Sequence, residues 1–501
     1  MNRGPSILLR LLPLAFLALA PRPAAQDRAA LAGTRPGTER WLVAWSGRPW
    51  GLEELAAACR GEAGAREPEA LVRELEARAA ADQEELGRLA AAHGGALLRS
   101  WWLVSAALVE IPPAALGALR AHPRVAAVQP DRLHAPHAPI LVSTDAANHA
   151  ADVPQGGGRL GQGVGIAVLD TGLDADMAGQ GRPHAAFFVN GDVQDRTGGG
   201  IGGSRLAANV NLGLMPADDV VGHGTGVAGI AAGQKWNAGP ASDRGHAPGA
   251  RIAGYSVADD AKGGAATSTI VTAWQAVTAD RARLGLAAAN FSYSGSPDPL
   301  DLSQQALDAA VLVGDLLAVV SAGNLGVFTT ASQACCNGLV VGAVEAGTRK
   351  PASFSCRGPL HGDPWRTYPD LCANGVDVVM PRRDDEGAFY KDSGTSMAAP
   401  QAAGAAALFR SIRLAATALE TKAALLAALE EVPRALAPAG VDARNVFGLG
   451  YLRTDRLAAL AGGGGIVQTH HLRASNPVLR LSFPVIPGRA YALAAAWHRH
   501  A

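Results

Sequence analysis

From about residue 140 onward, short apolar runs alternate with glycine-rich turns and alanine-rich stretches of helical character. The apolar runs are Val164 to Leu169, Ala250 to Val257, Leu286 to Phe291, Leu316 to Val320 and Gly338 to Val344. Runs this short, separated by helical segments, are typical of buried strands in a parallel sheet. The pattern therefore predicts an α/β fold with a mostly parallel sheet and helices on both faces. In such sheets, functional sites form at the carboxyl ends of the strands.

The part of the chain before this region has a different pattern. Its strand-like runs are Arg40 to Trp45, Ala96 to Ile111 and Val125 to Val128, and its helical segments are Glu67 to Ala92 and Ala114 to Ala121. This order of elements predicts a small α+β domain. A link that contains Pro and His, Arg132 to Pro139, ends the domain.

The first residues have the pattern of an export signal. Arg3 and Arg10 precede an apolar run, Leu11 to Ala20, and the small residues Ala24 and Ala25 offer a cleavage site. The run is too short to span a bilayer comfortably. We expect residues 1–25 to be a cleaved signal peptide and the protein to be secreted or extracytoplasmic, with no membrane anchor once the leader is removed. An uncleaved membrane anchor is the alternative.

The carboxyl-terminal end has a third pattern, which begins at a glycine run, Gly462 to Gly465. Such a run favours a flexible joint. Residues 466–501 then predict two or three strands, notably Val478 to Val485 and Ala490 to Trp497. Because so short a segment rarely folds alone, we expect a β-rich extension that packs on the preceding domain or forms part of a β-sandwich.

Charge and cysteine content narrow the classes of partner. Lys plus Arg equals Asp plus Glu, at 44 each, so no global charge attracts nucleic acid. Cys335, Cys336, Cys356 and Cys372 fall in one region, and an oxidising compartment would allow them to pair, with each of the first two bonded to one of the last two. Their spacing matches no zinc pattern, so we expect no metal there and no cofactor.

Ser396 has surroundings that suit a nucleophile. It follows a Gly-Thr turn, Gly394 and Thr395, and precedes a run of helix formers, Gln401 to Phe409. The start of a helix offers free N–H groups and a partial positive charge, which favour negative charge developing on an oxygen. The alternative is a serine that only caps an alanine-rich helix.

Three further polar residues lie at strand ends or at a helix start. Asp170 ends one apolar run, Asn324 follows another, and His223 begins an unusually glycine-rich helical segment. Asp and Asn at such positions are commonly turn residues. Each glycine in a helix costs about 1 kcal/mol relative to alanine, so we expect close backbone approach around His223 to compensate.

Four segments around these residues carry a resemblance to a known family. They are Asp170-Thr171-Gly172, His223-Gly224-Thr225, Ala322-Gly323-Asn324 and Gly394-Thr395-Ser396-Met397-Ala398. In identity and order they resemble the subtilisin-like serine proteases, peptidase family S8. Acid before histidine before serine is that family's order, whereas the α/β-hydrolases have serine first. The resemblance covers about residues 140 to 460 and implies a three-layer subtilisin-like fold.

The resemblance implies a role for each of the four polar residues. Ser396 would be the nucleophile and His223 the general base that takes its proton and later gives it to the leaving amine. Asp170 would fix the imidazole tautomer and stabilise its charged form. Asn324 would donate a hydrogen bond to the oxyanion, together with the backbone N–H of Ser396.

The resemblance also implies a groove that pairs with extended substrate backbone. Its substrate-binding residues would be Gly263, Gly264, Ser292, Tyr293, Ser294, Gly295, Ala322 and Gly323. Ordinary loop chemistry is the alternative for these segments. Gly226 and Gln401 stand where the family often has His, and Ser294 stands where Gly is usual. Structural calcium is not indicated, and we interpret Asp174, Asp176 and Asp192 as solvated loop acids.

The small α+β domain resembles the inhibitory propeptide of secreted subtilases. The implied organisation is a signal peptide over 1–25, a propeptide over 26–135, a catalytic domain over 136–461 and the β-rich extension over 466–501. The propeptide would act as an intramolecular inhibitor, cut away between about Asp131 and Leu141; a stable accessory domain is the alternative. Cys59 would leave with it, and the mature chain would keep four cysteines.

These features together predict a secreted serine endopeptidase that is made as a self-processing zymogen. Polypeptides would be its substrates, and we expect a monomer. One alternative is a binding scaffold that keeps the subtilase fold without catalysis. The other is a secreted esterase that uses the same three residues.

Overall fold

The computed structural model describes residues 34–46, 51–135, 160–234, 244–327, 332–360, 366–462, 467–472 and 479–484. The signal peptide expected over residues 1–25 and the strand expected over Ala490 to Trp497 lie outside these ranges. Within the described ranges, no helix has the length and apolar character needed to cross a membrane.

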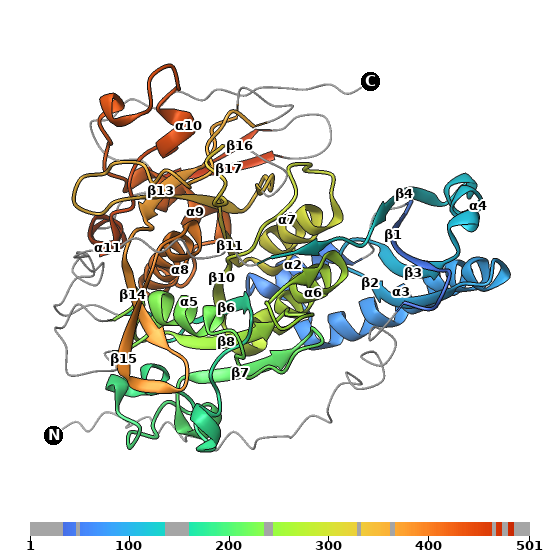
Figure 1. The fold of residues 1–501 in the computed structure, drawn as a ribbon, viewed down its shortest axis with the longest axis horizontal. Coiled ribbons are helices and arrows are strands. Elements are labelled where there is room, and N and C mark those ends of the chain that lie inside the picture. Colours follow the sequence, from blue (N-terminus) through green and yellow to red (C-terminus); the bar gives the residue numbers. More distant parts are fainter. Residues whose placement is uncertain are drawn as a thin grey trace, which may run out of the picture.

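A seven-stranded sheet forms the centre of the molecule, and all of its neighbouring strands are parallel (Figure 1). Its order is β13-β12-β11-β10-β6-β8-β7. The strands are β6 (Gly165–Asp170), β7 (Leu206–Asn211), β8 (Arg251–Ser256), β10 (Leu286–Phe291), β11 (Leu317–Ser321), β12 (Leu339–Val344) and β13 (Leu371–Asn374). The five predicted runs are all strands of this sheet. The pattern missed the two edge strands, because β7 carries polar residues and β13 is very short.

Helices cover both faces of the sheet, which confirms the predicted three-layer α/β fold. Helices α5 (His223–Ala232) and α8 (Thr395–Ile412) pack together on one face, and α6 (Thr267–Leu284) and α7 (Leu302–Gly314) pack together on the other (Figure 1). The side chains of β6 alternate between the two faces. Val168 packs in the cluster that contains Val227 of α5, whereas Leu169 belongs to the cluster that contains Ile270 of α6.

Smaller elements complete this part of the chain. They are the hairpin β14 (Val378–Arg382) and β15 (Asp385–Asp392), the helices α9 (Ala418–Ala427), α10 (Arg444–Phe447) and α11 (Thr454–Gly462), and the antiparallel pair β16 (Val467–Leu472) and β17 (Leu479–Pro484). Short 3-10 helices lie at Pro113–Ala115, Met177–Gly179, Ala185–Phe187, Val189–Gly191, Ile201–Gly203 and Arg434–Leu436. Strand β17 contacts α9, so the described part of the expected extension packs against the larger domain.

An antiparallel sheet of four strands forms the amino-terminal unit, in the order β2-β3-β1-β4. Its elements are β1 (Glu39–Trp45), α2 (Leu52–Cys59), α3 (Pro68–Ala92), β2 (Ala96–Trp101), β3 (Ala106–Ile111), α4 (Leu116–Ala121) and β4 (Val125–Pro130). The single run predicted over Ala96 to Ile111 is two strands, because the chain reverses at Ser105, whose φ is 45°. The sequence pattern also missed α2.

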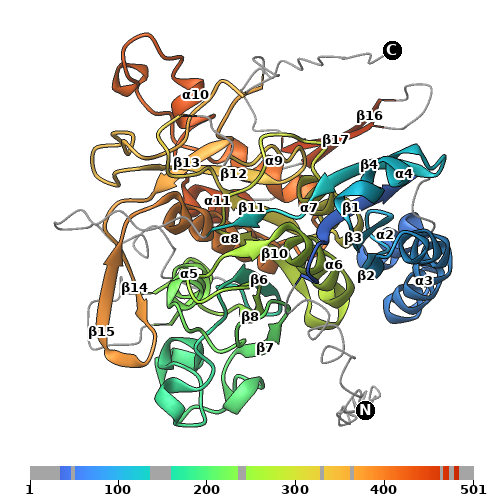
Figure 2. The ribbon, with the colours of Figure 1, turned by 45° about the vertical axis from the view of Figure 1, so that its right-hand side comes forward.

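The amino-terminal unit packs against α6 and α7 of the larger domain (Figure 2). The indole N–H of buried Trp101 donates to Thr272 Oγ1 at 2.9 Å, and the Trp102 backbone N–H donates to Gln275 Oε1 at 2.9 Å. Apolar side chains of α2 join the core cluster that also contains residues of α7. Both polar and apolar contacts therefore hold the unit in place.

The five cysteines, all of which lie in described residues, form no disulfide, and this corrects the predicted disulfides. Their sulfur atoms make separate contacts. Cys356 Sγ accepts from the Leu325 N–H, Cys372 Sγ donates to the Gly450 carbonyl, and Cys336 lies beside Arg366. Cysteines that are close in the sequence are therefore not bonded to one another in the fold.

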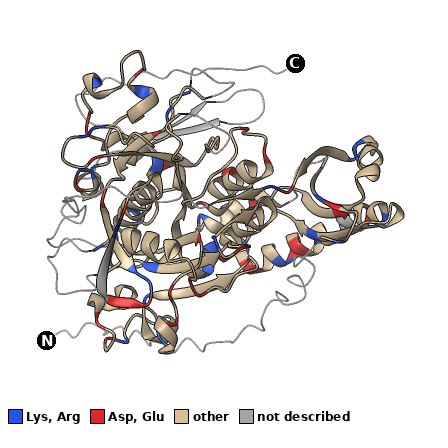
Figure 3. Cartoon of the chain, in the orientation of Figure 1, with Lys and Arg blue, Asp and Glu red and all other residues tan. Residues whose placement is uncertain are grey.

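Acidic and basic residues are interspersed over the ribbon of both units (Figure 3). This distribution agrees with the equal totals of the two kinds of charge.

Candidate active site

Three neighbouring strands bring distant segments to the same edge of the sheet. Leu169 of β6 pairs with Phe291 of β10, and Phe291 pairs in turn with Val320 of β11. Because the strands are parallel, the residues after these positions lie side by side at the carboxyl edge. This register places Asp170 next to Ser292 and brings the segment that contains Asn324 to the same edge.

Asp170 and His223 form a buried hydrogen-bonded pair. Asp170 Oδ1 lies 2.6 Å from His223 Nδ1 and also accepts from the Thr171 N–H at 2.8 Å. Asp170 is fully buried, and His223 is only 7% exposed. A carboxylate in this position holds Nδ1 in its protonated form, because an ionised carboxylate can only accept. In the neutral imidazole, His223 Nε2 therefore carries the lone pair.

Two opposing effects set the pKa of His223. Burial lowers it, because a charged imidazole loses solvation, but the nearby Asp170 carboxylate stabilises the charged form through its charge and its hydrogen bond. More distant carboxylates, Asp392 and Asp219, act in the same direction. The net result is a raised pKa for His223.

The glycines of α5 permit close backbone approach, as the sequence predicted. A Cβ at Gly224 would overlap the Gly172 carbonyl oxygen, directly beside the Asp170–His223 pair. A Cβ at Gly226 would overlap Met380, and one at Gly229 would overlap the Pro381 ring. Met380 of the β14–β15 hairpin therefore packs against Gly226, the position at which subtilisin-like proteases often have a second His.

Ser396 lies in the first turn of α8 and is fully buried. Its Oγ donates to the Ser292 carbonyl oxygen at 3.2 Å, and the Ser292 hydroxyl donates to the Ser396 carbonyl at 3.1 Å. His223 Nε2 is buried with no hydrogen-bond partner among the described residues. Helices α5 and α8, which carry His223 and Ser396, pack so closely that a Cβ at Gly404 would overlap the Ala231 carbonyl.

Thr395 orients Asn324. Asn324 Oδ1 accepts from both the Thr395 N–H at 2.9 Å and the Thr395 hydroxyl at 2.8 Å. Thr395 Oγ1 accepts in turn from the Gly323 N–H at 3.1 Å. Because the amide oxygen is fixed on this side, the amide nitrogen faces the other way, toward the space beside Gly394.

The groove predicted from the sequence contains part of the amino-terminal unit's tail. Strand β5 (Leu133–His134) pairs antiparallel with β9 (Ala265–Ala266), which directly follows Gly263 and Gly264. On the opposite side, the Ser294 N–H donates to the Ala135 carbonyl at 3.0 Å. The two predicted groove segments therefore hold one extended piece of chain between them.

The remaining residues predicted to line the groove make buried contacts with neighbouring segments. The Tyr293 hydroxyl donates to the Gly263 carbonyl at 2.6 Å, and a Cβ at Gly295 would overlap Gln333. Gln333 Nε2 donates to the Tyr293 carbonyl at 2.9 Å, and the Tyr368 hydroxyl donates to the Ala322 carbonyl at 2.7 Å. Sequence reasoning missed Gln333, Tyr368 and the orienting role of Thr395, because no local pattern marks side chains that reach the site from other segments.

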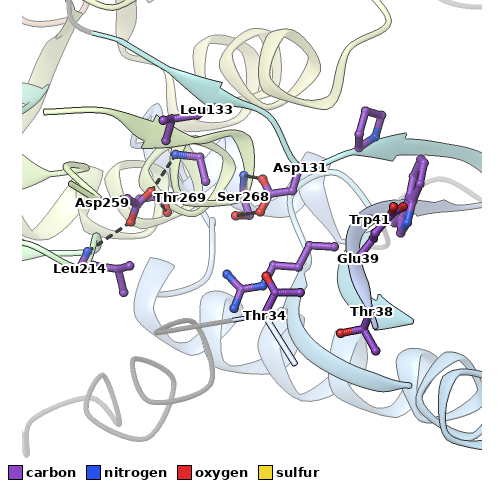
Figure 4. A pocket seen from close by; sticks show the side chains of 13 residues that line it. Thr34, Thr38, Glu39, Trp41, Asp131, Leu133, Leu214, Asp259, Ser268 and Thr269 are labelled. Carbon is purple, nitrogen blue, oxygen red and sulfur yellow. Dashed lines mark hydrogen bonds between the residues drawn. The ribbon is translucent and has the colours of Figure 1, made fainter. Parts of the chain in front are cut away.

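A cavity of about 650 Å³ lies between the amino-terminal unit and the start of α6 (Figure 4). Asp131 points toward Ser268 there, and its carboxylate accepts from the Ser268 N–H at 2.9 Å and hydroxyl at 2.8 Å. Asp259 accepts from the Thr269 hydroxyl at 2.9 Å in the same region. The tail is thus bound by α6 as well as by β9.

Asp174 differs from the sequence interpretation, which described it as a solvated loop acid. It is 2% exposed, whereas Asp176 and Asp192 are exposed as expected. Burial, together with nearby acidic residues, raises the pKa of Asp174 to about 7. Gln401 also has a structural explanation, because its side-chain amide donates to the Asn374 and Met397 carbonyls inside the core. Within the described ranges, no three His, Cys, Asp or Glu side chains gather as metal ligands.

The sequence model of the Subtilase family, Peptidase_S8, matches residues 161–450, which is more than half of the chain. The chain therefore belongs to the subtilase family and is a serine-type endopeptidase by class. The fold and the family agree with the resemblance drawn from the four motifs.

Several curated proteases are similar to this chain. Subtilisin-like protease PopC of Myxococcus xanthus is 32% identical over 55% of this chain and 58% of its own length. Alkaline protease of Alkalihalobacillus alcalophilus is 29% identical over 63% of this chain and 71% of its own length. Subtilisin Savinase of Lederbergia lenta is 32% identical over 50% of this chain and 78% of its own length. A solved cold adapted subtilisin-like serine proteinase is 24% identical, with a TM-score of 0.42 over 60% of this chain and 90% of that one.

Proposed function

We propose that this chain is a secreted serine endopeptidase that cuts itself from an inhibitory form, with Asp170, His223 and Ser396 as its triad. The observation that carries the proposal is the 2.6 Å contact between Asp170 and His223 Nδ1, which leaves the buried Nε2 without a partner among the described residues, beside the helix that bears Ser396. Secretion rests on the export pattern of residues 1–25.

In the first step of the proposed mechanism, the Ser396 hydroxyl turns from the Ser292 carbonyl to His223 Nε2. Ser396 Oγ then attacks the carbonyl carbon of the scissile peptide, and its proton passes to Nε2. The resulting imidazolium is stabilised by Asp170, whose effect on the pKa of His223 has the required direction. His223 next gives this proton to the leaving amine, and water hydrolyses the acyl-enzyme by the same path.

Asn324 and the start of α8 would stabilise the oxyanion of the tetrahedral intermediate. The bonds from Thr395 fix Asn324 Oδ1, so the Nδ2 donor is held in one orientation before substrate arrives. A donor that needs no reorganisation during the reaction stabilises developing charge most effectively. The backbone N–H of Ser396, in the first turn of α8, would be the second donor.

The amino-terminal unit would serve as the inhibitor. Its tail, Asp131 to Ala135, lies against the groove segments with the strand pairing that a substrate backbone would use. A peptide substrate would therefore need the space that this tail fills. The chain outside the described residues after Ala135 is where we expect the cut that releases the unit.

The intact mass of the secreted protein tests the proposal. We expect the wild-type chain to lose the leader and the residues up to the region of Asp131 to Leu141, whereas Ser396→Ala loses only the leader. Equal masses would contradict self-processing and favour the binding scaffold. Hydrolysis of a short ester, without hydrolysis of casein, would favour the esterase instead.

A further inference from the structure

The tail of the amino-terminal unit presents its two strand residues in opposite ways. Leu133 is 64% exposed, whereas His134 is only 7% exposed. This difference follows from strand geometry, because successive side chains point to opposite faces. The His134 side chain is therefore the one that packs against the wall of the groove.

The His134 imidazole makes a side-chain hydrogen bond with the groove. Its Nε2 lies 2.9 Å from Oγ1 of Thr267, the first residue of α6. Thr267 is only 1% exposed. Strand pairing of His134 with Ala265 fixes the backbone on one side, and Ser294 holds the next residue, Ala135. Contacts with the tail backbone thus set the position of the tail along the groove. The contact between His134 and Thr267 can then distinguish one side chain from another.

The same hydroxyl also lies near a carbonyl group of the tail, that of Arg132, which accepts from the Thr267 backbone N–H at 2.7 Å. Thr267 Oγ1 lies 3.2 Å from the Arg132 carbonyl oxygen, which can only accept. When the hydroxyl donates to this carbonyl, its oxygen is left to accept, so both contacts are satisfied by an Nε2–H donor. With the hydroxyl in this orientation, the groove favours a side chain that donates a hydrogen bond at this place.

We propose that this part of the groove selects substrates with histidine at the position of His134, and that Thr267 is the residue that determines this preference. The inference rests on the proposed endopeptidase function and adds its substrate class. An apolar residue of similar size would leave the buried Thr267 oxygen without the donor, and a small residue would leave space. A site built to hydrogen-bond a side chain discriminates strongly against analogues that lack the bonding group.

The surroundings favour the neutral imidazole. Burial lowers the pKa of His134, Asp301 opposes this effect, and Arg132 adds to it. Free histidine in a peptide has a pKa of about 6.5. Since the bound form is the neutral one, the preference for histidine should decline as pH falls below this value and the free peptide becomes charged.

Peptides with the sequence of residues 129–144 test the inference on the processed wild-type enzyme. We expect His134→Ala or His134→Phe in the peptide to lower kcat/KM about tenfold, whereas Leu133→Ala, at the exposed neighbouring position, changes it by less than about threefold. We also expect the ratio of kcat/KM for the unsubstituted peptide to that for the His134→Ala peptide to fall as pH is lowered from about 7.5 to about 5.5. This ratio cancels the titration of the catalytic histidine.

Two enzyme variants locate the preference. Thr267→Val keeps the branched shape but removes the hydroxyl, so the ratio for the two peptides should fall toward one. Thr269→Val is the matched control, because Thr269 bonds Asp259 and not the tail, and it should keep the wild-type ratio. Casein hydrolysis separates the two proposals. An enzyme that cleaves casein but cuts the unsubstituted and His134→Ala peptides equally would overturn the histidine preference alone, and an enzyme that cleaves neither casein nor peptide would overturn the endopeptidase function as well.

Discussion

Asn324 shows how the neighbours of a single amide determine what it can do. Asn324 Oδ1 accepts two hydrogen bonds from Thr395, so the amide group cannot turn without losing them. Thr395 also accepts from the Gly323 N–H, which ties the β11 segment to the start of α8. The orientation of one donor therefore depends on a residue adjacent to the nucleophile.

Asn324→Ala should lower kcat by about 10²–10³-fold, the range found for loss of such a donor within this family. Asn324→Asp is the sharper variant, because it keeps the oxygen that Thr395 bonds but has no N–H to donate. Steady-state kinetics on a peptide substrate would measure both. Leu325→Ala, at a side chain that is 61% exposed, should keep the wild-type kcat. An unchanged kcat in Asn324→Asp would remove Asn324 from the oxyanion site.

Asp170→Asn should move the acid limb of the pH profile to lower pH. His223 acts as a base only when unprotonated, so kcat/KM rises as pH passes upward through its pKa, which Asp170 raises. Without the carboxylate charge, burial remains and the pKa falls. We also expect kcat to drop about 10⁴-fold, as in other triads that lose this carboxylate. A limb that stays at the wild-type pH would contradict the role given to Asp170.

Helix α5 is an element in which weak local propensity is compensated by packing. Four glycines lie in or next to its first turns, and the chain passes close to them on several sides. The β14–β15 hairpin approaches through Met380 and Pro381, and α8 packs on the same helix. The position of His223 is thus set by contacts that side chains on α5 would prevent.

Gly229→Ala should destabilise the protein although alanine is the better helix former. The gain in helix propensity is about 1 kcal/mol, but the added methyl group overlaps the Pro381 ring, and overpacking costs about 1–3 kcal/mol. Thermal unfolding of the Ser396→Ala chain, which avoids self-digestion, would measure the difference. Gly117→Ala in α4 is the matched control, since nothing lies within 4 Å of its Cβ position, and it should raise stability. A higher midpoint of thermal unfolding for Gly229→Ala would show that the β14–β15 hairpin shifts to make room for the methyl group.

At the scale of the whole molecule, the amino-terminal unit and the larger domain form one continuous packed structure. Apolar contacts join α2 to α7, Gln275 and Thr272 of α6 bond the region of Trp101, and the tail occupies the groove. Asp131 stands at the centre of this arrangement, bonded to the first turn of α6. Burial raises the pKa of Asp131, although the two bonds from Ser268 oppose the shift.

Asp131→Ala should shorten the lag before protease activity appears. The variant leaves the Ser268 N–H and hydroxyl without their partner in the interface, and such loss weakens an interaction about tenfold or more. The time course of peptide hydrolysis during maturation would measure the lag. Glu84→Ala removes an acid from the exposed face of α3 and should keep the wild-type lag. Equal lags for Asp131→Ala and wild type would show that this contact does not hold the inhibitor.

The sequence by itself predicted the buried strands, such as Leu286 to Phe291, because a strand pattern depends on neighbouring residues in the chain. The same is true of the four motifs around Asp170, His223, Asn324 and Ser396. The catalytic roles and the domain boundaries stay predictions. Tertiary structure alone decided that the cysteines form no disulfide, that Asp174 is buried, that β7 and β13 are edge strands, and that His134 lies against Thr267. These features arise where segments far apart in sequence meet, and no local pattern records which segments will meet or how closely.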